Sequence, residues 1–206
     1  MFITFEGPEG SGKTTQFQRV FAAMQAAGVA VLATREPGGT RIGEQVRDIL
    51  LNKPEGAVMT AEAEALLFSA ARAQHVREVI RPALAAGQTV LCDRFYDSTL
   101  AYQGYGRGLD LAALRQITVF ATGGLTPDVT VYLDCPPEVG LGRKQSQAEL
   151  NRLDRLALAF HRRVYAGYRE MMQQEPERWV VVDATPGPDE VFARIAAALH
   201  RRGLRL

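Results

Sequence analysis

Residues 7 to 14 read Gly7-Pro8-Glu9-Gly10-Ser11-Gly12-Lys13-Thr14 and fit the phosphate-binding pattern G-x-x-x-x-G-K-[ST], the P-loop. The six residues before this loop are mostly apolar and β-forming, which predicts a short buried strand. After the loop, apolar residues recur at helical spacing between Phe17 and Met24. A strand, a glycine loop and a helix in this order are the context in which the motif binds phosphate. A glycine turn without a ligand is therefore the weaker interpretation.

Each residue type in the loop has a physical reason. Glycines let the backbone turn and approach a phosphate closely, and the loop amides, together with the N-terminus of the following helix, favour an anion. The Lys13 ammonium can reach the β- and γ-phosphates of a nucleotide, while the Thr14 hydroxyl can ligate Mg²⁺. The residues expected to bind the nucleotide here are Gly7, Pro8, Glu9, Gly10, Ser11, Gly12, Lys13, Thr14 and Thr15.

The rest of the chain alternates short apolar runs with helical patterns. Strand-like runs lie at residues 29–34, 88–92, 128–133 and 178–182. Together with the first strand they predict an α/β fold, with a parallel five-stranded sheet and helices on both faces. Ligands of such sheets bind beyond the carboxyl ends of the strands. Because the P-loop, residues 34–40 and Asp93-Arg94 all follow strands, we expect them to meet at one edge.

The composition is that of an ordinary globular protein. The 206 residues suffice for one domain with a substantial core, and we expect it to span residues 1–206, with a polar lid at about 143–155. A net charge of +1 gives no reason to expect nucleic acid or a membrane as a partner. The apolar runs are too short to cross a bilayer. The first residues read as a strand and not as a signal segment, so we expect a cytoplasmic protein with Cys92 and Cys135 reduced.

Four segments with recognisable signatures follow one another along nearly the whole chain. They are residues 2–15, which contain the P-loop; residues 34–40, Thr34-Arg35-Glu36-Pro37-Gly38-Gly39-Thr40; residues 93–104, Asp93-Arg94-Phe95-Tyr96-Asp97-Ser98-Thr99-Leu100-Ala101-Tyr102-Gln103-Gly104; and Asn151-Arg152-Leu153-Asp154 followed by Phe160-His161. Together they resemble the bacterial thymidylate kinase family. A P-loop alone would say little about the substrate, whereas four motifs in order are specific.

The resemblance implies a P-loop nucleoside-monophosphate-kinase fold. It also implies transfer of the γ-phosphoryl group of ATP to the 5′-phosphate of dTMP, which gives dTDP, with Mg²⁺ as a cofactor and a homodimer as the assembly. Because the acceptor phosphate is already an anion at neutral pH, such a reaction needs positioning and charge neutralisation more than a strong base.

The resemblance also suggests roles on the acceptor side. It places Phe68 against the thymine ring with Arg72 beside it, whereas the residues alone suggest a core aromatic and a solvated helix charge. Tyr102 near the sugar would leave no room for a 2′-hydroxyl, and the Gln103 amide suits a pyrimidine edge. The set expected to bind the acceptor is Glu9, Glu36, Pro37, Arg47, Phe68, Arg72, Arg94, Thr99, Tyr102 and Gln103, with Arg47 and Arg94 on the phosphate and Glu9, turned away from ATP, on a sugar hydroxyl.

The metal needs oxygen ligands at the phosphate end. Asp93 follows an apolar strand as a Walker-B aspartate does, so we expect it to hold Mg²⁺ through water, together with the Thr14 hydroxyl. The alternative for Asp93 is a helix N-cap.

The transferring phosphoryl group needs a further cation. Gly10 stands where some members of the family carry a catalytic arginine, so the resemblance implies that the arginine comes from the lid. We favour Arg152 for this role and Arg143 as the residue that stacks on adenine, with Arg155 and Lys144 as further candidates. A solvated basic helix face is the alternative for these arginines. The expected catalytic residues are thus Lys13, Arg94 and Arg152.

Two other functions are compatible with these residues. A kinase of another nucleotide, or of a nucleoside, would share the P-loop, the sheet and the lid, but a nucleoside kinase would want a general base for its neutral hydroxyl. A nucleotide-dependent switch protein is less favoured, because no N-K-x-D guanine motif follows any predicted strand.

Overall fold

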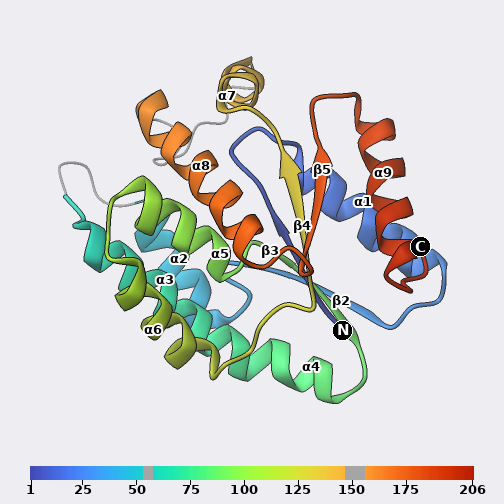
Figure 1. Ribbon diagram of the computed structural model, residues 1–206. Coiled ribbons are helices and arrows are strands. Elements are labelled where there is room, and N and C mark those ends of the chain that lie inside the picture. Colours follow the sequence, from blue (N-terminus) through green and yellow to red (C-terminus); the bar gives the residue numbers. More distant parts are fainter. Residues whose placement is uncertain (53–57, 147–155) are drawn as a thin grey trace.

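A five-stranded parallel sheet forms the centre of the protein in the computed structural model, which describes residues 1–52, 58–146 and 156–206 (Figure 1). Its strand order is β2-β3-β1-β4-β5. The expected parallel sheet is therefore confirmed, with bounds within a few residues of those predicted. The strands are β1 (Phe2–Glu6), β2 (Val31–Arg35), β3 (Thr89–Asp93), β4 (Val129–Asp134) and β5 (Trp179–Asp183).

Helices cover both faces of the sheet, because successive strand residues point to opposite sides. Ile3, Phe5 and Val131 belong to a core beneath α1 (Lys13–Ala26) and α9 (Pro188–Arg201), on the right in Figure 1. The opposite face packs against a larger group of helices. These are α3 (Ala61–His75), the π-helical η1 (Val76–Ile80), α4 (Arg81–Ala85), α5 (Tyr96–Thr99), the π-helical η2 (Leu100–Gly106), α6 (Leu111–Thr122) and α8 (Leu158–Gln174). Helix α2 (Arg41–Leu51) packs against α3.

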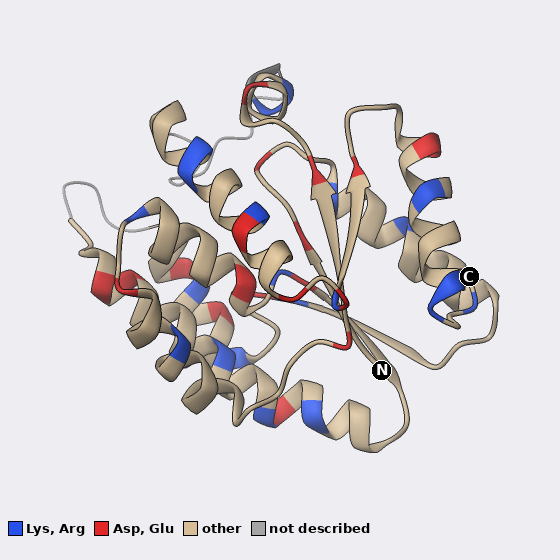
Figure 2. Ribbon diagram, viewed as in Figure 1, with Lys and Arg blue, Asp and Glu red and all other residues tan. Residues whose placement is uncertain are grey.

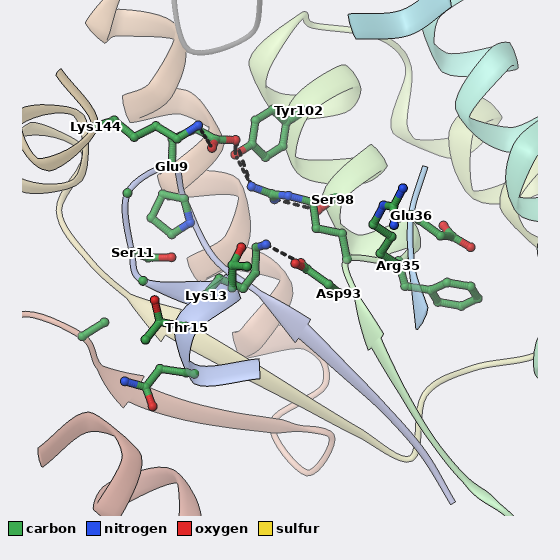
Figure 3. A pocket seen from close by; sticks show the side chains of 18 of the residues that line it. Glu9, Ser11, Lys13, Thr15, Arg35, Glu36, Asp93, Ser98, Tyr102 and Lys144 are labelled. Carbon is green, nitrogen blue, oxygen red and sulfur yellow. Dashed lines mark hydrogen bonds and ion pairs between the residues drawn. The ribbon is translucent and has the colours of Figure 1, made fainter. Parts of the chain in front are cut away.

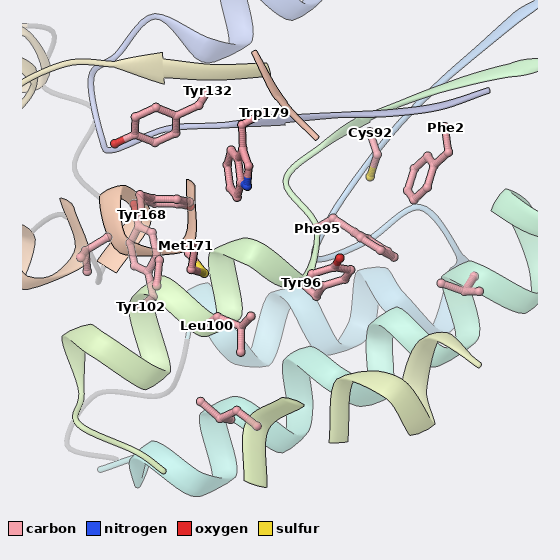
Figure 4. Packing of buried hydrophobic residues seen from close by; sticks show 14 of the residues in the cluster. Phe2, Cys92, Phe95, Tyr96, Leu100, Tyr102, Tyr132, Tyr168, Met171 and Trp179 are labelled. Carbon is pink, nitrogen blue, oxygen red and sulfur yellow. The ribbon is translucent and has the colours of Figure 1, made fainter. Parts of the chain in front are cut away.

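The core on that opposite face is rich in aromatic rings (Figure 4). Phe2 meets Phe95 edge to face with ring centroids 5.0 Å apart, and Tyr132 lies 5.0 Å from Tyr168 of α8. Such pairs add to the energy of area burial. Phe95 directly follows Arg94, so this core fixes the backbone from which a predicted site residue projects.

Charged residues of both signs are interspersed over the helices (Figure 2), in keeping with the net charge of +1. None of the helices in the described part of the chain combines the length and apolar character that a bilayer crossing requires.

The start of the predicted lid is helical. Residues 143–146 form the last turn of α7 (Pro137–Ser146), and residues 147–155, with Arg152 and Arg155, lie outside the described residues. The first half of α7 lies against the P-loop. A Cβ atom on Gly140 would stand 2.0 Å from the Glu9 carbonyl oxygen, and one on Gly10 would stand 1.8 Å from the Gly140 carbonyl oxygen. The approach of loop and helix therefore requires two residues without side chains.

This contact makes a prediction with a built-in control. Gly140→Ala should destabilise the protein by about 1–3 kcal/mol, the usual cost of overpacking, because neither backbone can give way cheaply. Gly142 lies in the same helix with open space around its Cβ position, so Gly142→Ala should be neutral or stabilising by up to about 1 kcal/mol through helix propensity. Denaturant unfolding of both variants measures this, and equal effects would contradict the proposed close packing.

Candidate active site

The loops that follow the strands converge on one cavity of about 950 Å³ (Figure 3). The P-loop follows β1, Glu36 and Pro37 follow β2, Arg94 follows β3 and residues 184–188 follow β5. The expectation that the P-loop, the segment after the second strand and Asp93-Arg94 meet at the carboxyl edge of the sheet is confirmed. The predicted site residues in the cavity wall are Pro8, Glu9, Gly10, Ser11, Gly12, Lys13, Thr14, Thr15, Glu36, Pro37, Arg47, Phe68, Arg72, Asp93, Arg94, Thr99, Tyr102, Gln103 and Arg143.

One end of the cavity has the features of a phosphate site. Gly10 and Gly12 have φ angles of 69° and 81°, a left-handed conformation that glycine adopts without strain. The Lys13 ammonium forms an ion pair with Asp93. Asp93 does not cap a helix, since the N-cap of α5 is Phe95, without a side-chain capping bond. Gly7 is not in the cavity wall; its Cβ would lie 3.0 Å from the Leu133 carbonyl oxygen, so it serves the turn itself.

Beside the P-loop, a second wall is formed by the segment after β5. Arg143 donates hydrogen bonds of 2.9 Å to the carbonyl oxygens of Ala184 and Thr185. The Gln16 amide donates to the Pro188 carbonyl oxygen at 2.8 Å. These bonds join α7, α1 and the start of α9 around one side of the cavity. The sequence reasoning identified Arg143 but missed residues 184–188, which lack any charged or aromatic signal.

In the middle of the cavity, three predicted residues form one polar cluster (Figure 3). Arg94 Nη2 and the Tyr102 hydroxyl both donate to Glu9 Oε1 at 2.9 Å, and Lys144 Nζ lies 3.2 Å from Glu9 Oε2. Burial raises the pKa of Glu9, but the charges of Arg94, Lys144 and Lys13 outweigh it and hold that pKa well below its usual value. Glu9 is thus an anion turned toward Arg94.

The far end of the cavity holds a buried network around Arg72. Its guanidinium donates to Glu36 Oε2 at 2.7 Å and to the Thr99 hydroxyl at 3.0 Å, and His75 Nδ1 lies 3.0 Å from Glu36 Oε1. Arg72 is only 1% exposed, so the interpretation as a solvated helix charge is wrong. Its Nη1 is buried and has no hydrogen-bond partner among the described residues, which leaves one donor for a ligand.

The remaining predicted residues lie around this network. Phe68 both packs against the aromatic core and lines the cavity, so the two interpretations of it are compatible. The Gln103 amide donates to Glu64 Oε1 at 2.8 Å, a bond that sequence reasoning did not foresee. Arg47 Nη1 donates to the Pro37 carbonyl oxygen at 2.9 Å, which ties α2 to the loop after β2.

Sequence reasoning missed one buried carboxylate next to the site. Glu6, the last residue of β1, is fully buried and accepts hydrogen bonds from the Phe95 amide, the Ser98 hydroxyl and the Tyr168 hydroxyl. A glutamate inside an otherwise apolar strand was the available signal, because buried carboxylates are rare unless they have partners. Among the described residues, no group of three or more His, Cys, Asp and Glu side chains could hold a metal ion by itself.

Comparisons with known proteins agree with this geometry. A model of the thymidylate kinase family matches residues 5–195. The chain is 54% identical over 203 residues to a thymidylate kinase of Deinococcus radiodurans, covering 98% of each chain, and 54% identical over 205 residues to one of Thermomicrobium roseum, covering 97% of this chain and 96% of the relative. The crystal structure of thymidylate kinase from Ehrlichia chaffeensis is 34% identical, with a TM-score of 0.77 over 97% of this chain and 98% of that one. With the P-loop nucleoside-monophosphate-kinase fold, the chain belongs to the thymidylate kinase family.

Proposed function

We infer that this protein transfers the γ-phosphoryl group of ATP to dTMP and releases dTDP and ADP, the reaction of its family. One observation carries the inference at the site: the P-loop with Lys13 and the arginine-lined acceptor end open into the same cavity. Both reacting groups are phosphates, so the work of the protein is to align them and to neutralise their charge. The cavity of about 950 Å³ is lined by far more cations than candidate bases.

On the donor side, we propose that the amides within residues 8–15 and the Lys13 ammonium bind the phosphates of ATP. We assign adenine to the space between Arg143 and the segment 184–188. The two carbonyl bonds of Arg143 support this assignment, because they fix a planar guanidinium beside the cavity, where it can stack on a base.

On the acceptor side, we propose that Arg47 and Arg94 bind the phosphate of dTMP, with Glu9 and Tyr102 at the sugar. Phe68, Arg72, Thr99 and Gln103 then surround the thymine, and Glu36 and Pro37 complete the wall. Arg72 Nη1, which has no hydrogen-bond partner among the described residues, supports this arrangement, because a thymine carbonyl could accept a hydrogen bond from it. Arg94 now pairs with Glu9, so dTMP would enter by exchanging partners with an existing ion pair.

We propose that Mg²⁺ assists, held by the Thr14 hydroxyl and, through water, by Asp93. Both side chains offer the hard oxygen ligands that Mg²⁺ prefers, and both lie in the cavity wall at the P-loop. Mg²⁺ held there would supply positive charge that offsets the negative charge of the phosphates. The ion pair of Asp93 with Lys13 supports the fit, because it puts the carboxylate beside the ammonium assigned to the phosphates.

The last catalytic group we propose is Arg152, which lies outside the described residues. Gly10 has no side chain to stabilise the transferring phosphoryl group, and the lid at 143–155 begins in α7, which packs against the P-loop.

We also propose that residues 1–206 form one domain around the single sheet. The free thiols of Cys92 and Cys135 support a reducing, cytoplasmic location.

The activity has a direct test. ADP release should depend on dTMP, and Lys13→Ala should reduce turnover by more than about 10²-fold, the scale for removing one transition-state charge contact. The variant should still fold and unfold in one cooperative transition, because in the described part of the chain the Lys13 side chain forms a hydrogen bond and an ion pair with Asp93 alone. ADP release at the same rate without dTMP would point to a switch protein or another acceptor.

We further propose that the protein is a homodimer through α3 and α6. These helices pack together and expose large apolar side chains: Leu66 is 54%, Val119 61% and Phe120 89% exposed. Exposed apolar side chains on two helices that pack together suit a second copy of the same surface related by a two-fold axis.

The dimer proposal predicts that Phe120→Lys yields monomers in sedimentation experiments while the wild type sediments as a dimer. Val181→Lys is the matched control, since Val181 is an exposed apolar residue of β5, away from α3 and α6, and it should remain dimeric. A wild-type monomer, or dissociation by both variants alike, would refute this interface.

A further inference from the structure

The Glu6 carboxylate lies between the P-loop and the segment that carries Arg94. Its Oε1 accepts from the Phe95 amide at 2.8 Å, and its Oε2 accepts from the Ser98 hydroxyl at 2.6 Å and the Tyr168 hydroxyl at 2.8 Å. Glu6 has no exposed surface and is not in the cavity wall. Any effect of Glu6 on the cavity therefore passes through residues that line it.

Arg94 is the residue that these bonds hold in place. Its φ of 68° makes it the only non-glycine residue with a left-handed backbone in the described part of the chain. Such a conformation costs on the order of 1–3 kcal/mol and persists only where the surroundings enforce it. The bond from the Phe95 amide to Glu6 fixes the peptide after Arg94, and the Cys92 thiol donates to the Arg94 carbonyl oxygen at 3.0 Å.

The Arg94 side chain is linked to the same carboxylate. Arg94 Nη1 donates to the Ser98 hydroxyl at 3.0 Å, and that hydroxyl donates on to Glu6 Oε2. Arg94 Nη1 and Glu6 Oε2 are 4.0 Å apart. The guanidinium is thereby held with Nη2 toward Glu9 in the cavity (Figure 3). Glu6 thus determines both where the backbone of Arg94 turns and which way its side chain points.

Burying a carboxylate to make these hydrogen bonds has a cost in folding free energy. Burial and the charge of Asp97 raise the pKa of Glu6 to about 7, against the opposing charge of Arg94. The other groups that face it are Ser98 on α5 and Tyr168 on α8. Asp97 is itself held by Arg178 through bonds of 2.6 and 2.9 Å. Because the ionised form is disfavoured by burial, fold stability alone does not explain a glutamate here.

We propose that Glu6 is a positioning residue for Arg94, whose carboxylate presets the guanidinium toward the acceptor phosphate before dTMP binds. The inference rests on the proposed role of Arg94 in binding that phosphate. A preset donor need not be reoriented when the substrate arrives, which is how fixed charges contribute most in an active site.

Glu6→Gln is the main test. The amide oxygen can still accept from Phe95, but the amide nitrogen replaces the oxygen beside Ser98, and the charge is lost. We expect kcat/KM for dTMP to fall by at least about tenfold, mainly through a higher KM for dTMP. The KM for ATP should stay within about threefold, because the bonds of Glu6 lead to the acceptor side. Tyr168→Phe is the control, because it removes another hydrogen-bond donor to the same carboxylate but leaves the bonds that connect Glu6 to Phe95 and Ser98. Its KM values for dTMP and for ATP should stay within about threefold of the wild-type values.

A second pair of variants tests the link with less risk to folding. Ser98→Ala removes the hydroxyl between Glu6 and Arg94 and should raise the KM for dTMP, whereas Ser98→Thr keeps a hydroxyl and should restore it toward the wild-type value. Equal effects of Ala and Thr, or equal changes in the KM values for dTMP and ATP in Glu6→Gln, would indicate a merely structural role and overturn the inference.

Arg94→Lys separates this inference from the proposed role of Arg94. If Arg94→Lys leaves the KM for dTMP unchanged, the assignment of Arg94 to the acceptor phosphate fails, and the inference fails with it. If Arg94→Lys raises that KM but Glu6→Gln does not, only the inference is overturned. The double variant should have a KM for dTMP within about threefold of that of Arg94→Lys, because both changes disrupt the same interaction. If the effects of the two changes multiply instead, Glu6 acts by another route.

Discussion

The acceptor half of the cavity depends on hydrogen bonds to one buried carboxylate. Glu6 ends β1, and it holds the Phe95 amide and the Ser98 hydroxyl that follow β3. Because β1 and β3 are neighbours in the sheet, a single side chain can tie the base of the P-loop to the turn at Arg94. The two loops that we propose to bind the donor and acceptor phosphates are therefore fixed relative to each other through the sheet and through Glu6.

Three cations of the cavity wall are paired with carboxylates. Lys13 pairs with Asp93, Arg94 with Glu9, and Arg72 with Glu36. Pairing keeps buried charges from remaining uncompensated, which would be strongly destabilising. We propose that phosphate binding exchanges the carboxylate partners of Lys13 and Arg94 for phosphate oxygens. A wall built in this way can hold several arginines close together, as alignment of two anions requires.

Periodicity and motif spacing were sufficient to predict the sheet, because buried parallel strands read as continuous apolar runs and the P-loop fixes the first strand–helix connection. They were also sufficient to predict that Asp93, Arg94 and Glu9 lie at one site. They could not reveal that Arg72 is buried, because helical spacing does not say which neighbours cover a side chain. Glu6 was missed for a similar reason: its partners Phe95, Ser98 and Tyr168 come from distant parts of the chain. Residues 184–188 form a wall through their backbone carbonyls, for which side-chain patterns carry no signal.

We propose that the turn at Arg94 is already formed before dTMP binds. Amide hydrogen exchange of Phe95 measures this most directly, because its N–H donates to Glu6 in a fully buried position and can exchange only when that bond opens. In the free enzyme the Phe95 amide should exchange as slowly as the amides of β1 and β3. Saturating dTMP should not change its rate relative to theirs. Rapid exchange of the Phe95 amide in the free enzyme, slowed only when dTMP binds, would contradict a preset acceptor site.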